Sequence, residues 1–347
     1  VLHIHESEGK GGIFINSDES NQNVTGGTVI MEIADNNDFP VTSKAPFWNV
    51  ILRNTSGGNG EHILAEGVDV GATDEYLAAQ PFKILKDLTI ESDAFLNHDG
   101  NDVYIGRDFY IDRNAQTATF DNSGLNDSYN DYNIGYLFDP AIPNNTIFNG
   151  SEDGELYIGY NTSDGFEQYF TDFTVNKTAD SRITIVCDNQ KTAQYQDDNN
   201  LGHWHARLIR IENALTIESG IFDQGQNAVR LFGPVNIGEN GQCGEWIEGT
   251  THPWAWFMLK DAELNIDTEE GAIIGNIKMN PNPHTDIINF TSDVYIKRIG
   301  YFHGRINLQS YELKLDYLDD GLTTNNYNIS DGNSAEEMFY STGNSSD

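Results

Sequence analysis

The chain has 347 residues, of which 54 are Asp or Glu and 19 are Lys or Arg, so its formal net charge at pH 7 is −35. Nucleic-acid binding needs clustered basic residues, and this charge balance argues strongly against that class of protein. With 38% hydrophobic residues, including 18 Phe and 16 Tyr, the chain has enough apolar material for a core. Its 33 Gly and only 4 Met are typical of a turn-rich, all-β protein.

Short stretches of alternating apolar residues follow one another along the chain, separated by Gly, Asn and Asp. Each stretch is typical of a short strand with one inward face. In chain order they include Leu88-x-Ile90, Val103-x-Ile105, Phe109-x-Ile111, Leu215-x-Ile217, Val235-x-Ile237 and Leu264-x-Ile266. The alternation and its repetition also predict a set of inward-facing side chains, namely Ile217, Phe222, Val229, Leu231, Val235 and Ile237.

The chain also repeats itself. The segment Leu88-Thr-Ile-Glu-Ser92 recurs without change as Leu215-Thr-Ile-Glu-Ser219, and a shortened third copy follows near the end, at Gly304-x-Ile306. Inexact copies of variable length are typical of solenoids, in which each coil contacts mainly its neighbours. We therefore predict one solenoid fragment over residues 1–347, with copies at about 27–150, 154–270 and 271–327, and with 328–347 as the start of a further repeat.

Three architectures fit short strands of this kind: the sandwich, the propeller and the parallel β-helix. Antiparallel folds should show two-residue Asn-Gly or Asp-Gly turns between alternating strands. Most such pairs here lie in longer polar loops, whereas Ser219-Gly-Ile-Phe222 is a sharp bend between short strands. We predict an all-β, right-handed parallel β-helix with coils of roughly 22 residues, and an array of β-sandwich modules is the alternative.

Residues 215–238 contain the phrase Leu-Thr-Ile-Glu-Ser-Gly-x-Phe-Asp, then Asn-x-Val-x-Leu and Gly-x-Val-x-Ile. This region resembles the repeat region of large Bacteroidetes cell-surface proteins, including gliding-motility adhesins. Phe170–Asn176 resembles the strand that precedes the phrase in those proteins, and the resemblance covers about two thirds of the chain. It implies a β-helical stalk or adhesin whose parent chain is exported by the type IX secretion machinery.

Location and cysteine chemistry follow from simpler features. No apolar stretch approaches the roughly 18 to 20 residues of a membrane span, and no charged-then-apolar leader precedes Val1, so we expect a soluble, processed or excised chain. The acidic excess favours an extracellular or cell-surface location in a bacterium, where divalent cations are also available. Cys187 and Cys243 lack the CxxC spacing of a zinc site, and the sequence leaves open whether they are bonded to each other.

Aromatic residues in polar loops are the candidate ligand-binding residues. Trp204 lies between His203 and His205, and Trp254 and Trp256 would share one face of an extended segment. An exposed Trp can stack on the apolar face of a sugar while His bonds its hydroxyls. The simpler alternative is that each Trp packs onto the coil beneath it. A metal held by the two His residues would need a third ligand, which the nearby sequence does not offer.

Calcium and catalysis have weaker signals. Asp99-Gly-Asn-Asp102 and Asp319-Asp-Gly321 look like fragments of calcium loops but lack EF-hand or nonapeptide spacing, so solvated turn acids are the simpler interpretation and Ca²⁺ stays open as a ligand. We expect no other cofactor. No hydrolase, metalloprotease, P-loop or dinucleotide fingerprint is present, so we expect no enzyme.

The sequence thus predicts a non-enzymatic adhesin or stalk segment that contacts polysaccharide or surfaces. The first alternative is a β-helical polysaccharide lyase or glycoside hydrolase, which would show a groove with several Asp beside Arg207 or Arg210. The second alternative is a passive spacer without any ligand.

Overall fold

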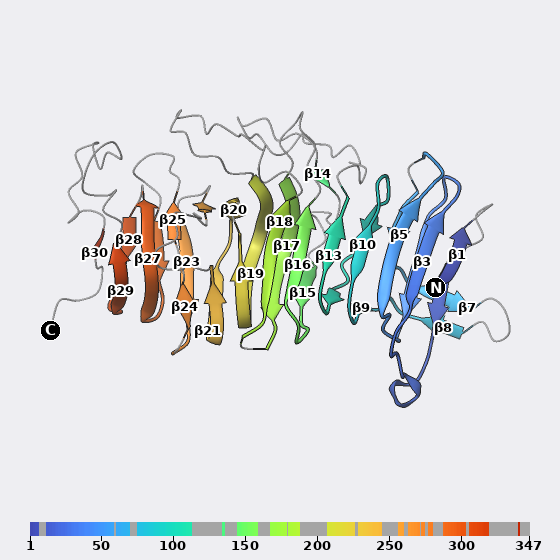
Figure 1. The fold of residues 1–347 in the computed structure, drawn as a ribbon, viewed down its shortest axis with the longest axis horizontal. Coiled ribbons are helices and arrows are strands. Elements are labelled where there is room, and N and C mark those ends of the chain that lie inside the picture. Colours follow the sequence, from blue (N-terminus) through green and yellow to red (C-terminus); the bar gives the residue numbers. More distant parts are fainter. Residues whose placement is uncertain are drawn as a thin grey trace. The chain divides into compact units, whose positions relative to one another are not determined.

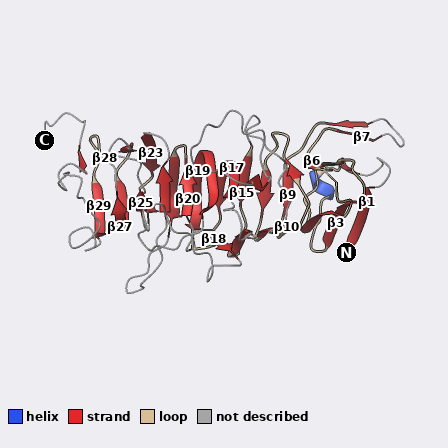
Figure 2. Ribbon diagram, turned by 90° about the horizontal axis from the view of Figure 1, so that it is seen from above, coloured by secondary structure: helices blue, strands red, loops and turns tan. Residues whose placement is uncertain are grey.

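The computed structural model of the chain describes residues 1–6, 12–58, 60–69, 75–112, 134–135, 144–158, 167–178, 180–187, 207–225, 228–244, 256–259, 263–270, 272–274, 277–279, 287–302, 305–318 and 339–340. Contacts divide the chain into two compact units, one of residues 1–171 with 187–189 and one of residues 172–186 with 190–347. The described part is built from strands, with one short 3₁₀ helix, η1 (Glu19–Asn21) (Figure 2). No helix in these residues has the length and apolarity that a membrane crossing requires.

Face A of the first unit is a row of parallel strands, each hydrogen-bonded to the next (Figure 1). Along the row the strands are β1 (Leu2–Glu6), β3 (Thr28–Ile33), β5 (Asn49–Asn54), β10 (Leu88–Ile90), β13 (Phe109–Ile111) and β16 (Gly154–Ile158). Neighbours in the row are separated in sequence by strands that pair elsewhere. A parallel row of this kind requires the chain to make a full coil between neighbours.

Two further parallel rows complete the coils of the first unit. Face B contains β9 (Phe82–Ile84), β12 (Val103–Ile105) and β15 (Asn145–Phe148), and face C contains β2 (Ile13–Ile15), β4 (Phe39–Ser43), β6 (His62–Ile63) and β11 (Leu96–Asn97). From β3 to β13 the chain visits faces A, C and B in that order and then returns to A. This cyclic order defines a three-faced parallel β-helix.

A few strands of the first unit lie outside these rows. They are the antiparallel pair β7 (Gly67–Asp69) and β8 (Glu75–Leu77), and β14 (Ile134–Gly135), which pairs with the beginning of β17 (Glu167–Asn176).

The second unit has the same plan, and its strands turn corners without a break. Its strands are β18 (Arg182–Cys187), β19 (Arg207–Asp223), β20 (Ala228–Leu231), β21 (Val235–Cys243), β22 (Trp256–Leu259), β23 (Glu263–Thr268), β24 (Ile273–Ile274), β25 (Ile277–Met279), β26 (Ile287–Phe290), β27 (Val294–Phe302), β28 (Arg305–Asn307), β29 (Leu313–Leu318) and β30 (Phe339–Tyr340). Residues 207–211 of β19 pair with β20, residues 215–217 pair with the start of β21, and residues 221–223 pair with β18. One strand of 17 residues therefore contributes to three faces.

The parallel pairing confirms the predicted β-helical fold and overturns the β-sandwich alternative. Sandwich sheets are antiparallel, whereas β7–β8 is the one antiparallel pair for which the described strands give a register. Crossovers between parallel strands are overwhelmingly right-handed in proteins, and the right-handed coil and the boundaries of the sequence copies stay predictions.

Coil length varies although the parallel pairing of the strands is kept. The coil that carries the chain from Asp87 to Asp108, at the starts of β10 and β13, has 21 residues, and the following coil, from Asp108 to Glu155, has 47 residues. In the second unit the coil from Asn289 to Asn307 has 18 residues. The shorter coils agree with the predicted length, and the longer ones carry insertions between faces. Such insertions are tolerated because they leave the inward rows unbroken.

The core consists of rows of apolar side chains, one from each coil. On face A of the first unit, one such row consists of residues that lie opposite one another in successive strands, and each is at most 1% exposed. They are Val50, Leu88, Phe109 and Leu156. The inward-facing residues predicted from the sequence are all buried, namely Ile217, Phe222, Val229, Leu231, Val235 and Ile237. That prediction is confirmed, so the alternation in the sequence correctly identifies the inward side of these strands of the second unit.

Asp and Asn side chains at strand starts join successive coils, in an arrangement that we call the pre-strand ladder. Each side-chain oxygen accepts a hydrogen bond from the backbone N–H at the matching corner of the next coil. The acceptor and donor pairs are Asn49 and Asp87 (3.3 Å), Asp87 and Asp108 (3.4 Å), Asp108 and Glu155 (3.0 Å), Asp102 and Asn145 (3.0 Å), Asp38 and Glu61 (3.1 Å), and Asp293 and Glu312 (2.8 Å). Part of the acidic excess therefore satisfies backbone donors at corners, where sheet pairing leaves them free.

Buried polar groups complete the interior of the first unit. His62 lies between the carbonyl oxygens of Met31 (2.9 Å from Nε2) and Phe95 (3.1 Å from Nδ1). The Nδ1 atom of His98 lies against the amide nitrogen of Asn144, whose oxygen accepts from Thr171 at 3.2 Å. Burial lowers the pKa of both histidines to about 4. Both are therefore neutral at physiological pH.

Candidate functional site

The residues predicted from the sequence to bind a ligand fall where the structure gives no side chains. His203, Trp204, His205 and Trp254 lie outside the described residues. Trp256 begins β22 and pairs with Ala228 of β20, but its side chain also lies outside the description. Their roles stay predictions.

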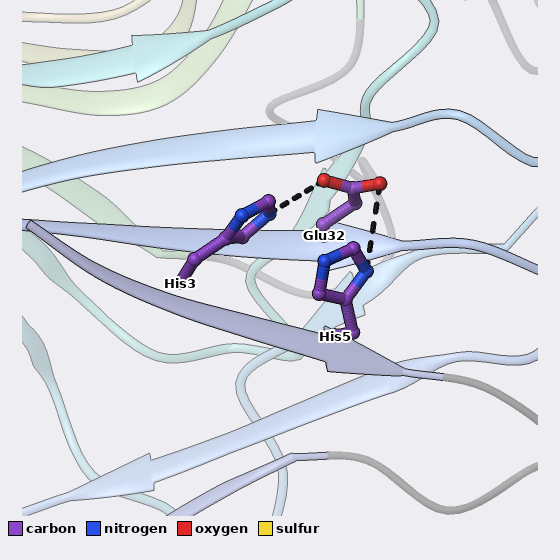
Figure 3. A group of neighbouring side chains, drawn as sticks. All are labelled: His3, His5 and Glu32. Carbon is purple, nitrogen blue, oxygen red and sulfur yellow. Dashed lines mark hydrogen bonds and ion pairs between the residues drawn. The ribbon is translucent and has the colours of Figure 1, made fainter.

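A different group of side chains meets on the outer surface of face A (Figure 3). His3 and His5 both project from β1, because residues two apart in a strand share a face. Glu32 lies directly opposite His5 on β3, and His3 lies opposite Ile30. The carboxylate of Glu32 is thereby placed between the two imidazoles. We call these three residues the His–Glu cluster.

The distances within the cluster are short. Oε2 of Glu32 is 2.5 Å from Nε2 of His3, and Oε1 is 3.6 Å from Nδ1 of His5, so each carboxylate oxygen faces one imidazole. One nitrogen of each ring and one carboxylate oxygen all lie within 4.8 Å of one another. Within the described ranges, no other group of three or more His, Cys, Asp or Glu residues meets this condition.

Exposure differs sharply between the carboxylate and the imidazoles. The Glu32 side chain is 10% exposed, whereas those of His3 and His5 are 37% and 54% exposed. The carboxylate is covered by its neighbours, but the outer sides of both rings meet solvent. The cluster is therefore a supported site with an open side.

Two residues of the next coil, Thr55 and Arg53, lie beside the carboxylate. The Thr55 hydroxyl donates to Oε1 of Glu32 at 2.8 Å. Arg53 approaches Oε2 to 4.0 Å, but its Nε and Nη2 atoms are bonded to Glu91 at 2.5 and 2.7 Å. The charge of Arg53 is thus largely taken up by Glu91, and Thr55 fixes the rotation of the Glu32 carboxylate.

These contacts decide the ionisation of Glu32. Burial raises its pKa, but the hydrogen bonds from Thr55 and His3, together with the charges of His5 and His3, lower it by more, so the net pKa lies below its ordinary value. Glu32 is a carboxylate at neutral pH. Two imidazole nitrogens and one carboxylate oxygen are a donor set that can hold a divalent metal ion, and the same residues can form ion pairs when the imidazoles are protonated.

The acidic loop fragments considered for calcium have other partners where they are described. The amide of Asn101 donates to the carbonyl oxygen of Leu64 at 2.9 Å, and Asp102 belongs to the pre-strand ladder. The fragment at 319–321, and a further acidic fragment of the same kind, Asp197-Asp-Asn-Asn200, lie outside the described residues. Cys243 is a free, buried thiol, and burial raises its pKa.

Sequence reasoning missed the His–Glu cluster. Two signals were present: a His-x-His pair on the outward positions of an alternating segment, and a Glu within the mostly apolar strand Thr28–Ile33. No family model, curated protein or solved structure matches this chain.

Proposed function

We propose that this chain is a non-enzymatic segment of an adhesin or stalk at the cell surface, which contacts polysaccharide or a solid surface. The observation that carries this proposal is the parallel pairing of strands from coil to coil, which is kept although the coils have 18 to 47 residues. Such a scaffold can present loops of many lengths without disturbing its core. The resemblance of residues 215–238 to Bacteroidetes repeats, with type IX export of the parent chain, supports the same proposal.

Aromatic side chains on the outer surface also support contact with sugars. Tyr110 of β13 stacks on Tyr157 of β16, with ring centroids 4.1 Å apart and planes tilted by 4°. Tyr110 remains 40% exposed. Flat aromatic surfaces bind the apolar faces of sugar rings, and this pair adds to the predicted contacts at Trp204, Trp254 and Trp256.

The acids clustered at the corner between faces B and A favour a structural role over a catalytic one. Arg107 donates to both oxygens of Asp87, at 2.8 and 2.6 Å, and Lys86 pairs with Glu152. The hydrogen bond from Lys86 lowers the pKa of Glu152. A general acid needs a raised pKa, so this corner is better suited to joining coils than to glycoside cleavage.

The proposal is tested by binding the purified chain to a panel of acidic and neutral polysaccharides. We expect binding that weakens at least about tenfold when Trp204, Trp254 or Trp256 is changed to Ala, because stacked aromatics contribute about 1–3 kcal/mol each, by analogy with base stacking. Trp48→Ala is the matched control, since Trp48 lies beside Lys86 at a corner of the first unit.

Two other outcomes of the binding experiment would overturn the proposal. Release of reducing ends or of unsaturated sugars from the same panel would identify an enzyme. Absence of binding to every polysaccharide and to solid surfaces would identify a passive spacer.

A further inference from the structure

We propose that His3, His5 and Glu32 bind a divalent transition-metal ion of the zinc class, and that this ion ties strand β1 to strand β3. The inference is independent of the proposed adhesin function, because it concerns the outer surface of face A and not the loops.

The donor atoms select the class of metal. Zinc and similar ions take imidazole nitrogen and carboxylate oxygen together, and sites with three protein ligands leave a fourth position for water. Calcium and magnesium instead prefer sets made of oxygen alone. Two nitrogens and one oxygen in the cluster therefore point to a transition metal.

The geometry is close to what such an ion needs. Metal–ligand bonds of roughly 2.0–2.1 Å in a tetrahedral site place ligand atoms about 3.4 Å apart. Oε2 of Glu32 lies 2.5 Å from Nε2 of His3, and Oε1 lies 3.6 Å from Nδ1 of His5. With one ligand atom taken from each residue, the three atoms lie within 4.8 Å of one another. Rotations of two partly exposed imidazoles, without backbone movement, can make up differences of this size. The exposed sides of the rings leave the fourth position open to water.

The surroundings of the cluster favour the binding of a cation by the Glu32 carboxylate. Thr55 holds one oxygen of the carboxylate, which is the kind of outer contact that orients metal ligands. The one basic side chain that ion-pairs with Glu32 in the described residues besides the two histidines is Arg53, and it is bonded to Glu91. The net charge of −35 also raises the local concentration of cations around the chain.

The place of the cluster gives the ion a structural consequence. In the described residues β1 has one sheet neighbour, β3, and its residue Leu2 is 56% exposed. Two ligands come from β1 and one from β3, so a bound ion would cross-link neighbouring coils. It should therefore stabilise β1 against local opening.

Zinc titration of the full chain, after removal of metal by a chelator, tests the proposal. The test variants are the double variant His3→Gln with His5→Gln, and Glu32→Gln. Glu155→Gln is the matched control, because Glu155 is an exposed residue of β16, at the other end of the face A row from β1 and β3. Isothermal titration calorimetry should show that the wild-type chain and the control bind one more equivalent of zinc than the double variant. Glu32→Gln should weaken that equivalent by at least about tenfold.

Hydrogen exchange then reports on the cross-link. Zinc should slow amide exchange in residues 2–6 of the wild-type chain and leave the double variant unchanged, and calcium at the same concentration should slow neither. Exchange in the chelated state shows whether the double variant still pairs β1 with β3. The proposal would be overturned if wild type and double variant bound the same number of zinc equivalents, or if zinc left exchange in residues 2–6 unchanged. The cluster would then be a histidine–carboxylate ion pair without a metal.

Discussion

Leu88 and Thr89 are adjacent residues of β10 whose side chains point to opposite sides of face A, and they offer a direct test of the inward rows. Leu88 is fully buried and lies between Val50 and Phe109 of the neighbouring coils. Replacing it by Ala removes three carbon groups at about 0.8 kcal/mol each, or about 2.4 kcal/mol. The cavity left between the coils raises the expected cost toward about 5 kcal/mol.

The measurement is urea unfolding followed by circular dichroism. With an m-value of about 2 kcal/mol per molar urea, Leu88→Ala should lower the unfolding midpoint by about 1 M or more. Thr89→Ala should change the free energy of unfolding by less than about 0.5 kcal/mol, because its side chain faces outward. Equal shifts from the two substitutions would refute the inward assignment of the Leu88 row.

The remaining predictions concern pH and the tight corners. His62 and His98 have pKa values of about 4 in the folded chain, below about 6.5 when unfolded, so the stability they contribute is complete above pH 6.5 and is lost as pH falls towards 4. The loss of stability amounts to as much as about 3 kcal/mol for each histidine. In urea titrations at several pH values, His98→Gln should remove one histidine's share of this loss. The same dependence of unfolding free energy on pH in the variant and the wild type would contradict the prediction. Gly106→Ala should cost about 1–3 kcal/mol, since a Cβ there would clash with the carbonyl oxygen of Leu85, whereas Gly26→Ala, with open space around it, should be neutral in the same assay. Equal midpoints for these two variants would show that the corner relaxes freely.

Strand positions were predictable because the signal is local. Alternation of period two identifies Leu215-x-Ile217 and Val235-x-Ile237 without knowledge of their partners, and both pairs are buried in one parallel register. The continuity of β19 was not predictable in the same way. From the sequence, Gly220 is interpreted as a break between two strands. In the structure it is a corner with φ of +85°, and residues on both sides of it pair with β21.

The His–Glu cluster was hidden for a different reason. Glu32 meets His5 only through the register of β1 on β3, two segments that a full coil of the chain separates. A slip of one residue would turn Glu32 towards the opposite side of the sheet and separate it from both imidazoles. Nothing in the local sequence fixes that register. The long coils, such as the one from Phe109 to Leu156, were unpredictable because their insertions follow no strand period.

The pre-strand ladder has a direction that bears on how the coils are laid down. In every pair the acceptor side chain belongs to the earlier coil and the donor N–H to the later one, as in Asn49, Asp87 and Asp108. A completed coil thus presents oriented side-chain oxygens to the segment that follows it in the chain. That segment finds its register from a preformed template and needs no distant partner, which keeps the loop-closure cost of each added coil small. For the coils joined by these six pairs, the side chains thus favour addition of coils from the amino-terminal side, whereas the backbone N–H groups of Glu239 and Thr268 donate the other way, to Glu269 and Ser292 of the following coil.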